Sequence, residues 1–195
     1  MAKYKGPVLK RARALGVAPQ VLGINKKSNK NPNTGRNKLS EYGLQVKEKQ
    51  KAKFVYGVLE KQFRKLYAKA EKMQGITGEN LLQLLELRFD NVVYRMGFAK
   101  TRSEAKQLIA HGHFLINGKK VDIPSYTVSQ GDVISVREKS RNNGIFKYAE
   151  DKVWNQAQWV SVDIEKLEGK VNSIPTREDI DFEINEQLIV ELYSR

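Results

Sequence analysis

The sequence predicts an α+β fold, in which helices come first and a short antiparallel sheet follows. Three observations predict it. Apolar residues recur at helical spacing through residues 41–72, residues 81–97 form a second and strongly apolar helical segment, and short apolar runs flank an Asn-Gly pair at residues 117–118. With 195 residues, the chain has room for one large domain or two small ones.

Residues 1–39 form a basic arm that is rich in Asn and Gly and poor in apolar periodicity. Such a segment cannot bury enough apolar surface to offset the entropy lost when its backbone becomes ordered. We therefore expect the arm on its own to be largely disordered.

Two helical stretches follow the arm. Ser40 begins the first, and Gly57 is expected to divide it because glycine is a poor helix former. The apolar stripe of this stretch consists of Val55, Leu59, Phe63 and Leu66, beside Val58, Gln62 and Tyr67. The second stretch, residues 81–97, is predicted to be buried and to be kinked or broken near Phe89.

A capped helix then leads into strands. Thr101 and Glu104 have the spacing of a capping box, which predicts a helix that stops at Gly112. The runs FLI and KKV on either side of Asn117-Gly118 predict a hairpin with a type I′ turn, because both turn residues tolerate positive φ. The remaining predicted elements are strands at 125–128, 132–136 and 159–163, a short helix near 145–157, and a final helix at 185–194.

The charge of the chain indicates a polyanionic partner. The 35 Lys and Arg residues against 22 Asp and Glu residues give a formal charge of +13, and basic groups near phosphates release condensed counterions. Residues 1–86 carry 19 basic and 6 acidic groups, whereas residues 151–195 carry 5 and 10. Nucleic acid is therefore the first candidate and an anionic membrane surface the second, and the acidic end is expected to face basic protein.

Several classes of protein are disfavoured by composition. No apolar run approaches the roughly 18 residues of a spanning helix, and the first residues lack the apolar core of a secretory signal. The chain has no cysteine, so it can form neither a disulfide nor a thiolate metal site. We expect a soluble, intracellular protein without a cofactor.

Both histidines, His111 and His113, flank Gly112. A metal site would need further ligands, and the chain has no cysteine or third histidine to supply them. The alternative is structural, with one ring in the last turn of the helix and the other at the start of a strand. We expect no bound metal, and we expect both rings to lie on a basic surface where they contact RNA.

The predicted basic surface joins the capped helix to the hairpin and suits structured RNA, which is recognised through its backbone and shape. A solvated basic face without a ligand is the alternative. The candidate RNA-contacting residues are Lys10, Arg11 and Arg13 in the arm, Lys47, Lys49, Lys51, Lys53 and Arg64 in the first helical stretch, Arg102, Ser103, Lys106 and Gln107 on the polar face of the capped helix, and His111, His113, Lys119 and Lys120 beyond it.

Residues 88–140, RFDNVVYRMGFAKTRSEAKQLIAHGHFLINGKKVDIPSYTVSQGDVISVREKS, resemble the RNA-binding module named after the fourth small-subunit ribosomal protein. The module occurs in several families, including pseudouridine synthases and a tyrosyl-tRNA synthetase. Its flanks, LSEYGLQVKEKQKAKFVYGVLEKQFRKLY and INEQLIVELYSR, are similar to the family of that ribosomal protein in its bacterial or organellar form. The resemblance covers nearly the whole chain.

The resemblance implies a helical domain, residues 40–87 completed by 175–195, into which residues 88–174 are inserted as a small RNA-binding module of helices on a short antiparallel sheet. It implies a structural constituent of the small ribosomal subunit that nucleates assembly at a multi-helix junction in the 5′ part of the ribosomal RNA and contributes to translational accuracy. Many relatives carry a zinc-binding cysteine cluster in the arm, which this chain lacks, so no metal is carried over.

The implied partners are the small-subunit ribosomal RNA, neighbouring small-subunit proteins including the fifth, and messenger RNA near its entry path. The implied location is the ribosome, in the cytoplasm or an organelle, away from membranes. The alternative is an RNA-modifying or tRNA-handling enzyme that uses the same module, and a regulator that binds messenger RNA is compatible with the ribosomal role. The motifs of such enzymes are missing, so we expect no catalytic activity.

Overall fold

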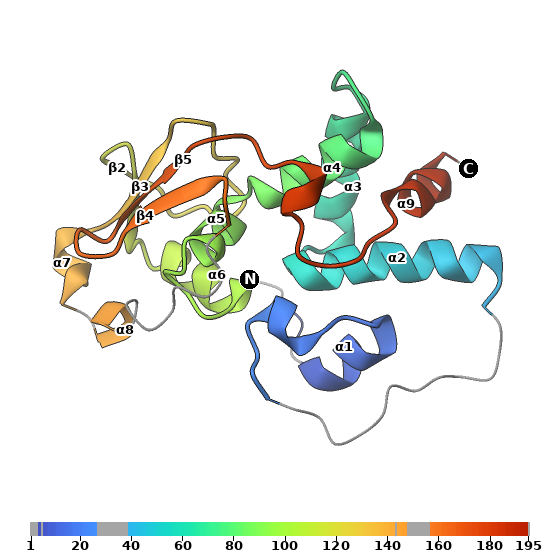
Figure 1. The fold of residues 1–195 in the computed structure, drawn as a ribbon, viewed down its shortest axis with the longest axis horizontal. Helices are drawn as coiled ribbons and strands as arrows, with labels where there is room; N and C mark the ends of the chain where they lie inside the picture. Colours follow the sequence, from blue (N-terminus) through green and yellow to red (C-terminus); the bar gives the residue numbers. More distant parts are fainter. Residues whose placement is uncertain (1–3, 5, 27–38, 143, 148–156, 195) are drawn as a thin grey trace. The chain divides into compact units, whose positions relative to one another are not determined.

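The chain folds into two compact units (Figure 1). The computed structural model describes residues 4, 6–26, 39–142, 144–147 and 157–194. Unit 1 comprises Met1–Leu82 and Ile180–Arg195, and unit 2 comprises Gln83–Asp179. The C-terminal residues thus return to the unit in which the chain begins.

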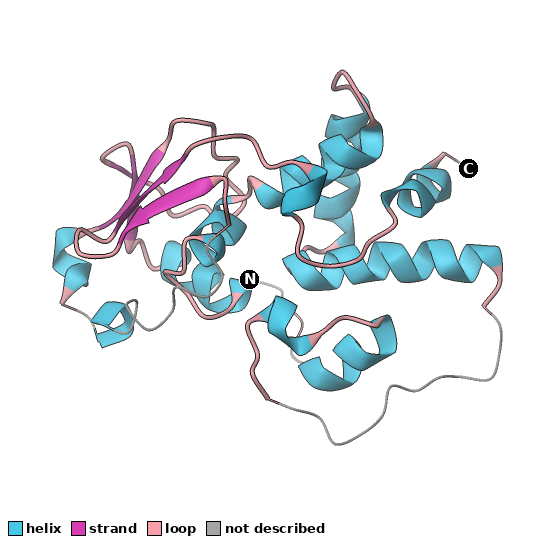
Figure 2. Ribbon diagram, viewed as in Figure 1, coloured by secondary structure: helices cyan, strands magenta, loops and turns pink. Residues whose placement is uncertain are grey.

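Unit 1 is helical (Figure 2). Its elements are α1 (Val8–Leu15), the 3-10 helix η1 (Pro19–Leu22), α2 (Glu41–Tyr56), α3 (Glu60–Glu71), most of α4 (Thr77–Glu86) and α9 (Glu186–Tyr193). The side chain of Ser40 caps α2 by accepting a hydrogen bond from the Gly43 amide at 3.2 Å. Gly57, with φ of 60°, ends α2, which confirms the predicted break.

Residues 6–26 of the arm are ordered by packing against the rest of unit 1, which the expectation for the isolated arm did not include. Ala12 on α1 is fully buried, and Val17 and Val21 are buried as well. The guanidinium of Arg11 lies 4.8 Å from the ring centre of Tyr4 and donates to Gln50 Oε1 on α2 at 3.2 Å. These few side chains are enough to fix α1 on α2. The rest of the arm, residues 27–38, lies outside the described residues.

The C-terminal helix α9 completes the core of unit 1, and its predicted position is confirmed. The ring of Tyr193 stacks on Tyr67 of α3 at 4.5 Å between centroids, and Phe63 is fully buried beside them. Leu59 departs from the predicted apolar stripe, since it is 45% exposed. Its backbone is extended because it is the N-cap of α3, so its side chain leaves the helical face.

Unit 2 combines helices with a five-stranded antiparallel sheet, which confirms the α+β prediction. The strand order is β2-β1-β3-β5-β4. The strands are β1 (Phe114–Ile116), β2 (Lys119–Lys120), β3 (Val133–Val136), β4 (Val160–Asp163) and β5 (Glu168–Val171). The other elements are α5 (Phe89–Arg95), α6 (Arg102–Ala110), α7 (Glu138–Arg141), α8 (Gly144–Lys147) and the 3-10 helix η3 (Arg177–Asp179).

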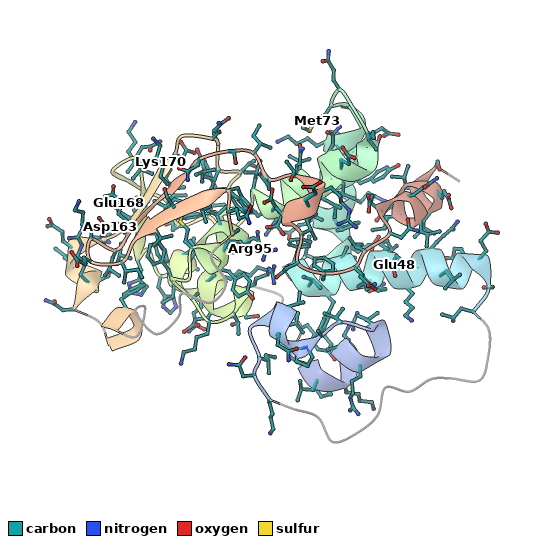
Figure 3. The ribbon with its side chains drawn as sticks, viewed as in Figure 1. Glu48, Met73, Arg95, Asp163, Glu168 and Lys170 are labelled. Atoms are coloured by element: carbon teal, nitrogen blue, oxygen red, sulfur yellow. The ribbon has the colours of Figure 1, made fainter. Side chains whose placement is uncertain are left out.

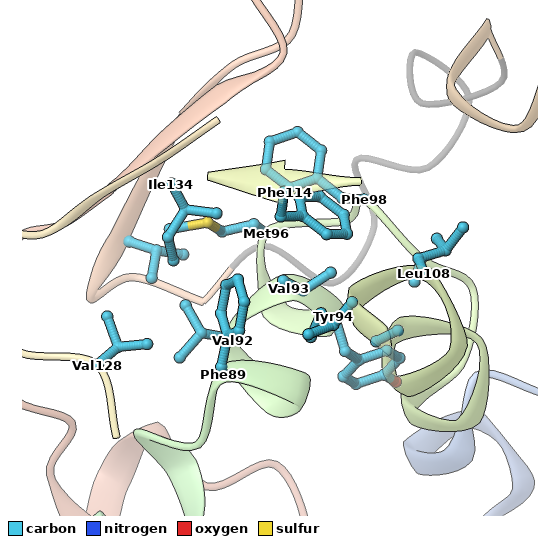
Figure 4. Packing of buried hydrophobic residues seen from close by; sticks show 14 of the residues in the cluster. Phe89, Val92, Val93, Tyr94, Met96, Phe98, Leu108, Phe114, Val128 and Ile134 are labelled. Carbon is cyan, nitrogen blue, oxygen red and sulfur yellow. The ribbon is translucent and has the colours of Figure 1, made fainter. Parts of the chain in front are cut away.

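The sheet packs one face on α5 and α6 around the core of unit 2 (Figure 4). The ring of Phe114 on β1 lies 6.1 Å from Phe89 and 6.0 Å from Phe98, and all three are fully or almost fully buried. A Cβ atom on Gly169 of β5 would lie 2.6 Å from the sulfur of Met96, so glycine allows this strand to approach α5 closely.

Local hydrogen bonds fix the two motifs that border the sheet. Thr101 Oγ1 accepts from the Glu104 amide at 3.1 Å, which is one half of the predicted capping box, whereas the Glu104 carboxylate accepts from the amide of Lys100 at 2.6 Å. Asn117 has φ of 48° and Gly118 of 77°, which confirms the hairpin turn. The side-chain amide of Asn117 donates through Nδ2 to Asp132 Oδ1 at 2.8 Å and accepts through Oδ1 from the Val133 backbone amide at 2.9 Å. This side chain therefore connects the hairpin to β3.

Two strand predictions differ from the structure. Residues 125–128 form no strand beyond an isolated bridge between Arg88 and Thr127, because the Pro124 and Tyr126 carbonyls accept hydrogen bonds from the first amides of α5. Strand β5 was not predicted, since Glu168, Gly169 and Lys170 lack apolar alternation. The predicted helix at 145–157 is represented by α8, and residues 148–156 lie outside the described residues.

Candidate nucleic-acid interface

Arg102 is not on the exposed polar face of α6, so that expectation is wrong. Its side chain is 5% exposed, its Nε donates to Asn91 Oδ1 at 2.7 Å, and its guanidinium lies 4.3 Å from the ring centre of Tyr94. Both partners belong to α5, which precedes α6. Arg102 therefore joins the two helices, while Ser103 and Gln107 on the same helix are exposed.

A buried ion pair fixes the end of α4 to α5. The carboxylate of Glu86 is fully buried and accepts from Arg95 Nε at 3.0 Å and Nη2 at 2.9 Å. It also accepts a hydrogen bond from Asn91 Nδ2 at 2.6 Å. The Oδ1 atom of Asn91 in turn accepts the hydrogen bond from Arg102 Nε. Figure 3 labels Arg95 within unit 2. This chain of contacts sets the direction in which α6 leaves α5.

Lys106 belongs to a second buried group, around Asp90. Asp90 is only 1% exposed. Its carboxylate accepts hydrogen bonds from Arg88 Nε at 3.1 Å and Arg88 Nη2 at 2.8 Å, and it lies 3.6 Å from Lys106 Nζ. Burial lowers the pKa of Lys106 below its ordinary value, and the Asp90 carboxylate offsets part of that effect. The ammonium is thus held at a defined position at the edge of α6, with 18% of the side chain exposed.

Four basic side chains gather around Gly112, and we call them the basic cluster: His111, His113, Lys120 and Arg137. They come from the end of α6, the start of β1, β2 and the end of β3. The two imidazole centroids are 6.1 Å apart, and Arg137 Nη1 donates to the Gly112 carbonyl at 3.5 Å. The Lys120 chain lies over Gly112, where an added Cβ would be 2.5 Å from Lys120 Cε.

The basic cluster is partly open to solvent, and its positive charge comes from Lys120 and Arg137. His111 and Lys120 are exposed, whereas His113 is half-buried, with Nδ1 2.9 Å from Ser140 Oγ. Burial lowers the pKa of His113 below its ordinary value, and the proximity of His111 and Arg137 lowers it further. Lys120 lies 3.6 Å from the exposed Asp122, a contact that water weakens. A phosphate would be attracted to this group.

Sequence reasoning did not include Arg137 in the surface, because residues 137 and 112 are distant along the chain. The antiparallel pairing of Phe114 with Val136 brings them together. The neighbouring Lys119 is exposed and forms no ion pair among the described residues. Arg141 is exposed as well and donates to the Val136 carbonyl at 3.4 Å.

Replacing Arg102 with Ala is expected to lower the free energy of unfolding of unit 2 by about 2–3 kcal/mol, because a buried charged hydrogen bond is lost. Lys119→Ala should change it by less than about 0.5 kcal/mol. Urea unfolding followed by tryptophan fluorescence measures both, since Trp154 and Trp159 fall within unit 2. Equal stabilities of the two variants would contradict the buried position of Arg102.

The lysines of α2 are engaged within unit 1. Lys49 and Lys53 contact the Glu60 carboxylate at 3.1 and 2.6 Å, and Lys51 contacts Glu48 at 3.2 Å. Glu48, labelled in Figure 3, also accepts from the Asn185 amide at 3.1 Å, just before α9. Lys47 is half-buried and forms no ion pair among the described residues. These ion pairs compete with phosphate contact.

The carboxylate of Glu60 also accepts a hydrogen bond from the hydroxyl of Tyr193 on α9 at 2.9 Å. Burial raises the pKa of Glu60, but hydrogen bonds from Lys53, Lys49 and Tyr193 outweigh it and lower the pKa from 4.5 to about 2. Burial raises the pKa of Tyr193 above its ordinary value, and the hydrogen bond to Glu60 raises it further. The carboxylate therefore holds α2, α3 and α9 together in its charged form.

A lowered pKa in the folded state stabilises the fold above the unfolded pKa, and this contribution is lost as the pH falls through the folded pKa. Wild-type unit 1 should therefore be more stable than Glu60→Gln above pH 4.5, and the difference should shrink as the pH falls to about 2. Urea unfolding followed by circular dichroism at pH 6, 4 and 2.5 measures it. A difference that does not depend on pH would show that Glu60 is not ion-paired.

The arm residues and Arg64 complete the predicted set. Lys10 is exposed, and Arg13 is half-buried with Nε donating to the Leu9 carbonyl at 3.3 Å. Arg11 on α1 is engaged by its hydrogen bond to Gln50 on α2. Arg64 is exposed on α3. No described group of three or more His, Cys, Asp or Glu residues could hold a metal ion, and no described helix is long and apolar enough to cross a membrane.

Both parts of the chain resemble known proteins. Residues 3–86 match the family model of the ribosomal protein S4/S9 N-terminal domain, and residues 87–134 match the model of the S4 domain. The small ribosomal subunit protein uS4 of Lachnospira eligens is 54% identical over 197 residues, which is 100% of both chains. That of Fusobacterium nucleatum is 49% identical over the same shares. Protein uS4A of Alkaliphilus oremlandii is 64% identical over 82% of this chain and 78% of its own.

Proposed function

Because the chain belongs to the uS4 family of small ribosomal subunit proteins, we propose that it is a structural constituent of the small subunit and binds its ribosomal RNA. The uS4 family is not an enzyme family. The relatives that match the whole chain are ribosomal proteins, so the alternative of an RNA-modifying enzyme gains no support.

The basic cluster carries this proposal. Its four side chains come from separate elements and meet around Gly112, next to the exposed Lys119. A compact positive surface of this kind fits the phosphates of a folded RNA, whose backbone and 2′-hydroxyls are accessible to side chains when its deep major groove is not. We propose that Ser103 and Gln107 extend this surface along α6.

We further propose that residues 88–174 act as an RNA-binding module inserted into a helical domain of residues 40–87 and 175–195. The division into two units, with the C-terminal residues in unit 1, supports this arrangement. The proposed RNA site is a multi-helix junction in the 5′ part of the small-subunit RNA, where binding would nucleate assembly. Messenger RNA near its entry path is a second proposed ligand.

Neighbouring proteins, including the fifth small-subunit protein, are proposed to contact the acidic part of the chain and to link it to translational accuracy. Asp163 and Glu168 are paired directly across β4 and β5 and both are exposed (Figure 3). Lys166 contacts Asp163 at 3.3 Å and offsets part of this negative charge. The charge that remains would repel phosphate, so this part of the sheet suits basic protein rather than RNA.

Sedimentation of the tagged full-length chain tests the proposed function. The chain should migrate with small ribosomal subunits and with their early assembly intermediates, and remain bound after a wash at moderate salt. A chain found only among free proteins, although it is folded, would contradict the proposal.

A further inference from the structure

The turn between β1 and β2 holds a chemically labile pair of residues. Asn117 and Gly118 form this turn, and both are exposed to water. Glycine has no Cβ atom to shield its backbone nitrogen, so this nitrogen can attack the side-chain carbonyl carbon of a preceding asparagine in a chain that is free to rotate. The chain contains one other such pair, Asn143-Gly144.

The reaction at this pair is a deamidation that needs only base and water. The Gly118 nitrogen loses its proton to base and forms a bond to Cγ of Asn117. The bond from Cγ to Nδ2 breaks, and the nitrogen takes up a proton from water and leaves as ammonia. Water then opens the cyclic imide at either carbonyl group, which places an aspartate or an isoaspartate at position 117.

The folded hairpin holds Asn117 away from the geometry that this reaction requires. Its φ of 48° places it in the left-handed region, where Cβ lies nearly opposite the Gly118 nitrogen about the bond from Cα to C, whereas ring closure requires both on the same side. Its side chain is also fixed at both ends, by Asp132 Oδ1 at 2.8 Å and by the Val133 amide at 2.9 Å. Cyclisation therefore requires the hairpin to open.

We propose that Asn117 is a deamidation site that the fold keeps closed. It reacts in chains whose hairpin is open, and the product does not form the hairpin again. Chains that stay unfolded are thereby altered irreversibly, whereas chains that fold promptly keep the asparagine.

Both products are incompatible with the hairpin contacts. An aspartate places a negatively charged oxygen where Nδ2 now lies, 2.8 Å from the Asp132 carboxylate, so two like charges replace a hydrogen bond. An isoaspartate adds one carbon to the main chain and shifts the register of Ile116 with Lys119. Strand β2 carries Lys119 and Lys120, so RNA binding is expected to weaken, a consequence that rests on the proposed function.

The first test compares deamidation rates in the full-length chain, folded and in concentrated urea, at the same mildly alkaline pH. Peptide mass spectrometry follows each asparagine separately. In urea, Asn117 and Asn143 should react at similar rates, because both precede glycine in an open chain. In the folded chain, Asn117 should react on the order of 10-fold more slowly or less, since the hairpin must open locally.

The variant Asp132→Ala removes the acceptor of Asn117 Nδ2 and should raise the rate in the folded chain toward the rate in urea. Circular dichroism shows whether this variant is folded. An equal rate at Asn117 in the folded and urea-unfolded wild type would overturn the proposal, whatever the behaviour of the variant.

The second test measures the effect of the product on RNA binding. Asn117→Asp should lower the affinity for the 5′ part of the small-subunit RNA on the order of 10-fold, because it adds a negative charge and weakens the strand that carries two lysines. The matched control is Asn172→Asp, an exposed residue of unit 2 whose Oδ1 accepts from Ser161 Oγ, a contact that aspartate retains. The control should bind like the wild type.

The outcomes separate this proposal from the proposed function. Wild-type affinity and stability of Asn117→Asp would overturn the claim that the product cannot form the hairpin, while the proposed function stands. A wild-type chain that fails to bind the RNA would overturn the proposed function, and the deamidation rates would still decide whether the fold protects Asn117.

Discussion

Replacing Glu86 with Ala is expected to lower the free energy of unfolding of unit 2 by about 3–5 kcal/mol, the usual cost of breaking a buried ion pair. The carboxylate is fully buried and receives two hydrogen bonds from Arg95, whose side chain is 3% exposed, and one from Asn91. Removing it leaves the guanidinium without its paired charge at a site that water does not reach. The hydrogen bond from Asn91 to the same carboxylate is lost as well.

Urea unfolding followed by tryptophan fluorescence measures this loss, because both tryptophans belong to unit 2. Glu165→Ala is the control, since Glu165 is an exposed carboxylate of the same unit and should change stability by less than about 0.5 kcal/mol. A loss below about 1 kcal/mol for Glu86→Ala would mean that the ion pair does not hold α4 and α5 together.

Neutralising the basic surface of unit 2 should have the largest effect on RNA binding. The triple variant Lys119→Gln, Lys120→Gln, Arg137→Gln removes two cations of the basic cluster and the neighbouring Lys119. If each contacts a phosphate, the slope of log affinity against log salt should fall by about 2–3, and affinity at 0.1 M salt on the order of 100-fold. Filter binding to the 5′ part of the small-subunit RNA at several salt concentrations measures both quantities.

The control for this variant removes three exposed lysines from other places: Lys26→Gln, Lys166→Gln and Lys170→Gln. It lowers the net charge by the same amount. An equal loss of affinity in both variants would show that overall charge, rather than the arrangement around Gly112, governs binding. Unfolding curves close to that of the wild type are expected for both.

The sequence predicted those elements whose signals lie within a few residues. Ser40 before α2, the pair Thr101 and Glu104, and Asn117-Gly118 each form the local hydrogen bond or backbone angle that their pattern indicates. The predicted start of the closing helix at Asn185 is equally local, since its side chain accepts from the Leu188 amide at 3.3 Å.

The wrong predictions concern contacts between segments. Arg102 looks exposed from helical spacing, but Asn91 and Tyr94 on the preceding helix bury it. The pairing of Lys51 with Glu48 could have been found from its three-residue spacing, whereas that of Lys49 with Glu60 depends on the turn between α2 and α3. Arg137 reaches Gly112 only because of the register of β1 with β3.

Cross-linking of the chain to small-subunit RNA within assembled subunits, followed by mass spectrometry of the linked peptides, shows directly which surface binds the RNA. Peptides that contain residues 111–120 and 137–141 should be linked to RNA. The exposed acidic residues of β4 and β5 should be absent from the linked set. Links confined to residues 160–171, with none near Gly112, would contradict the assignment of this surface as the RNA interface.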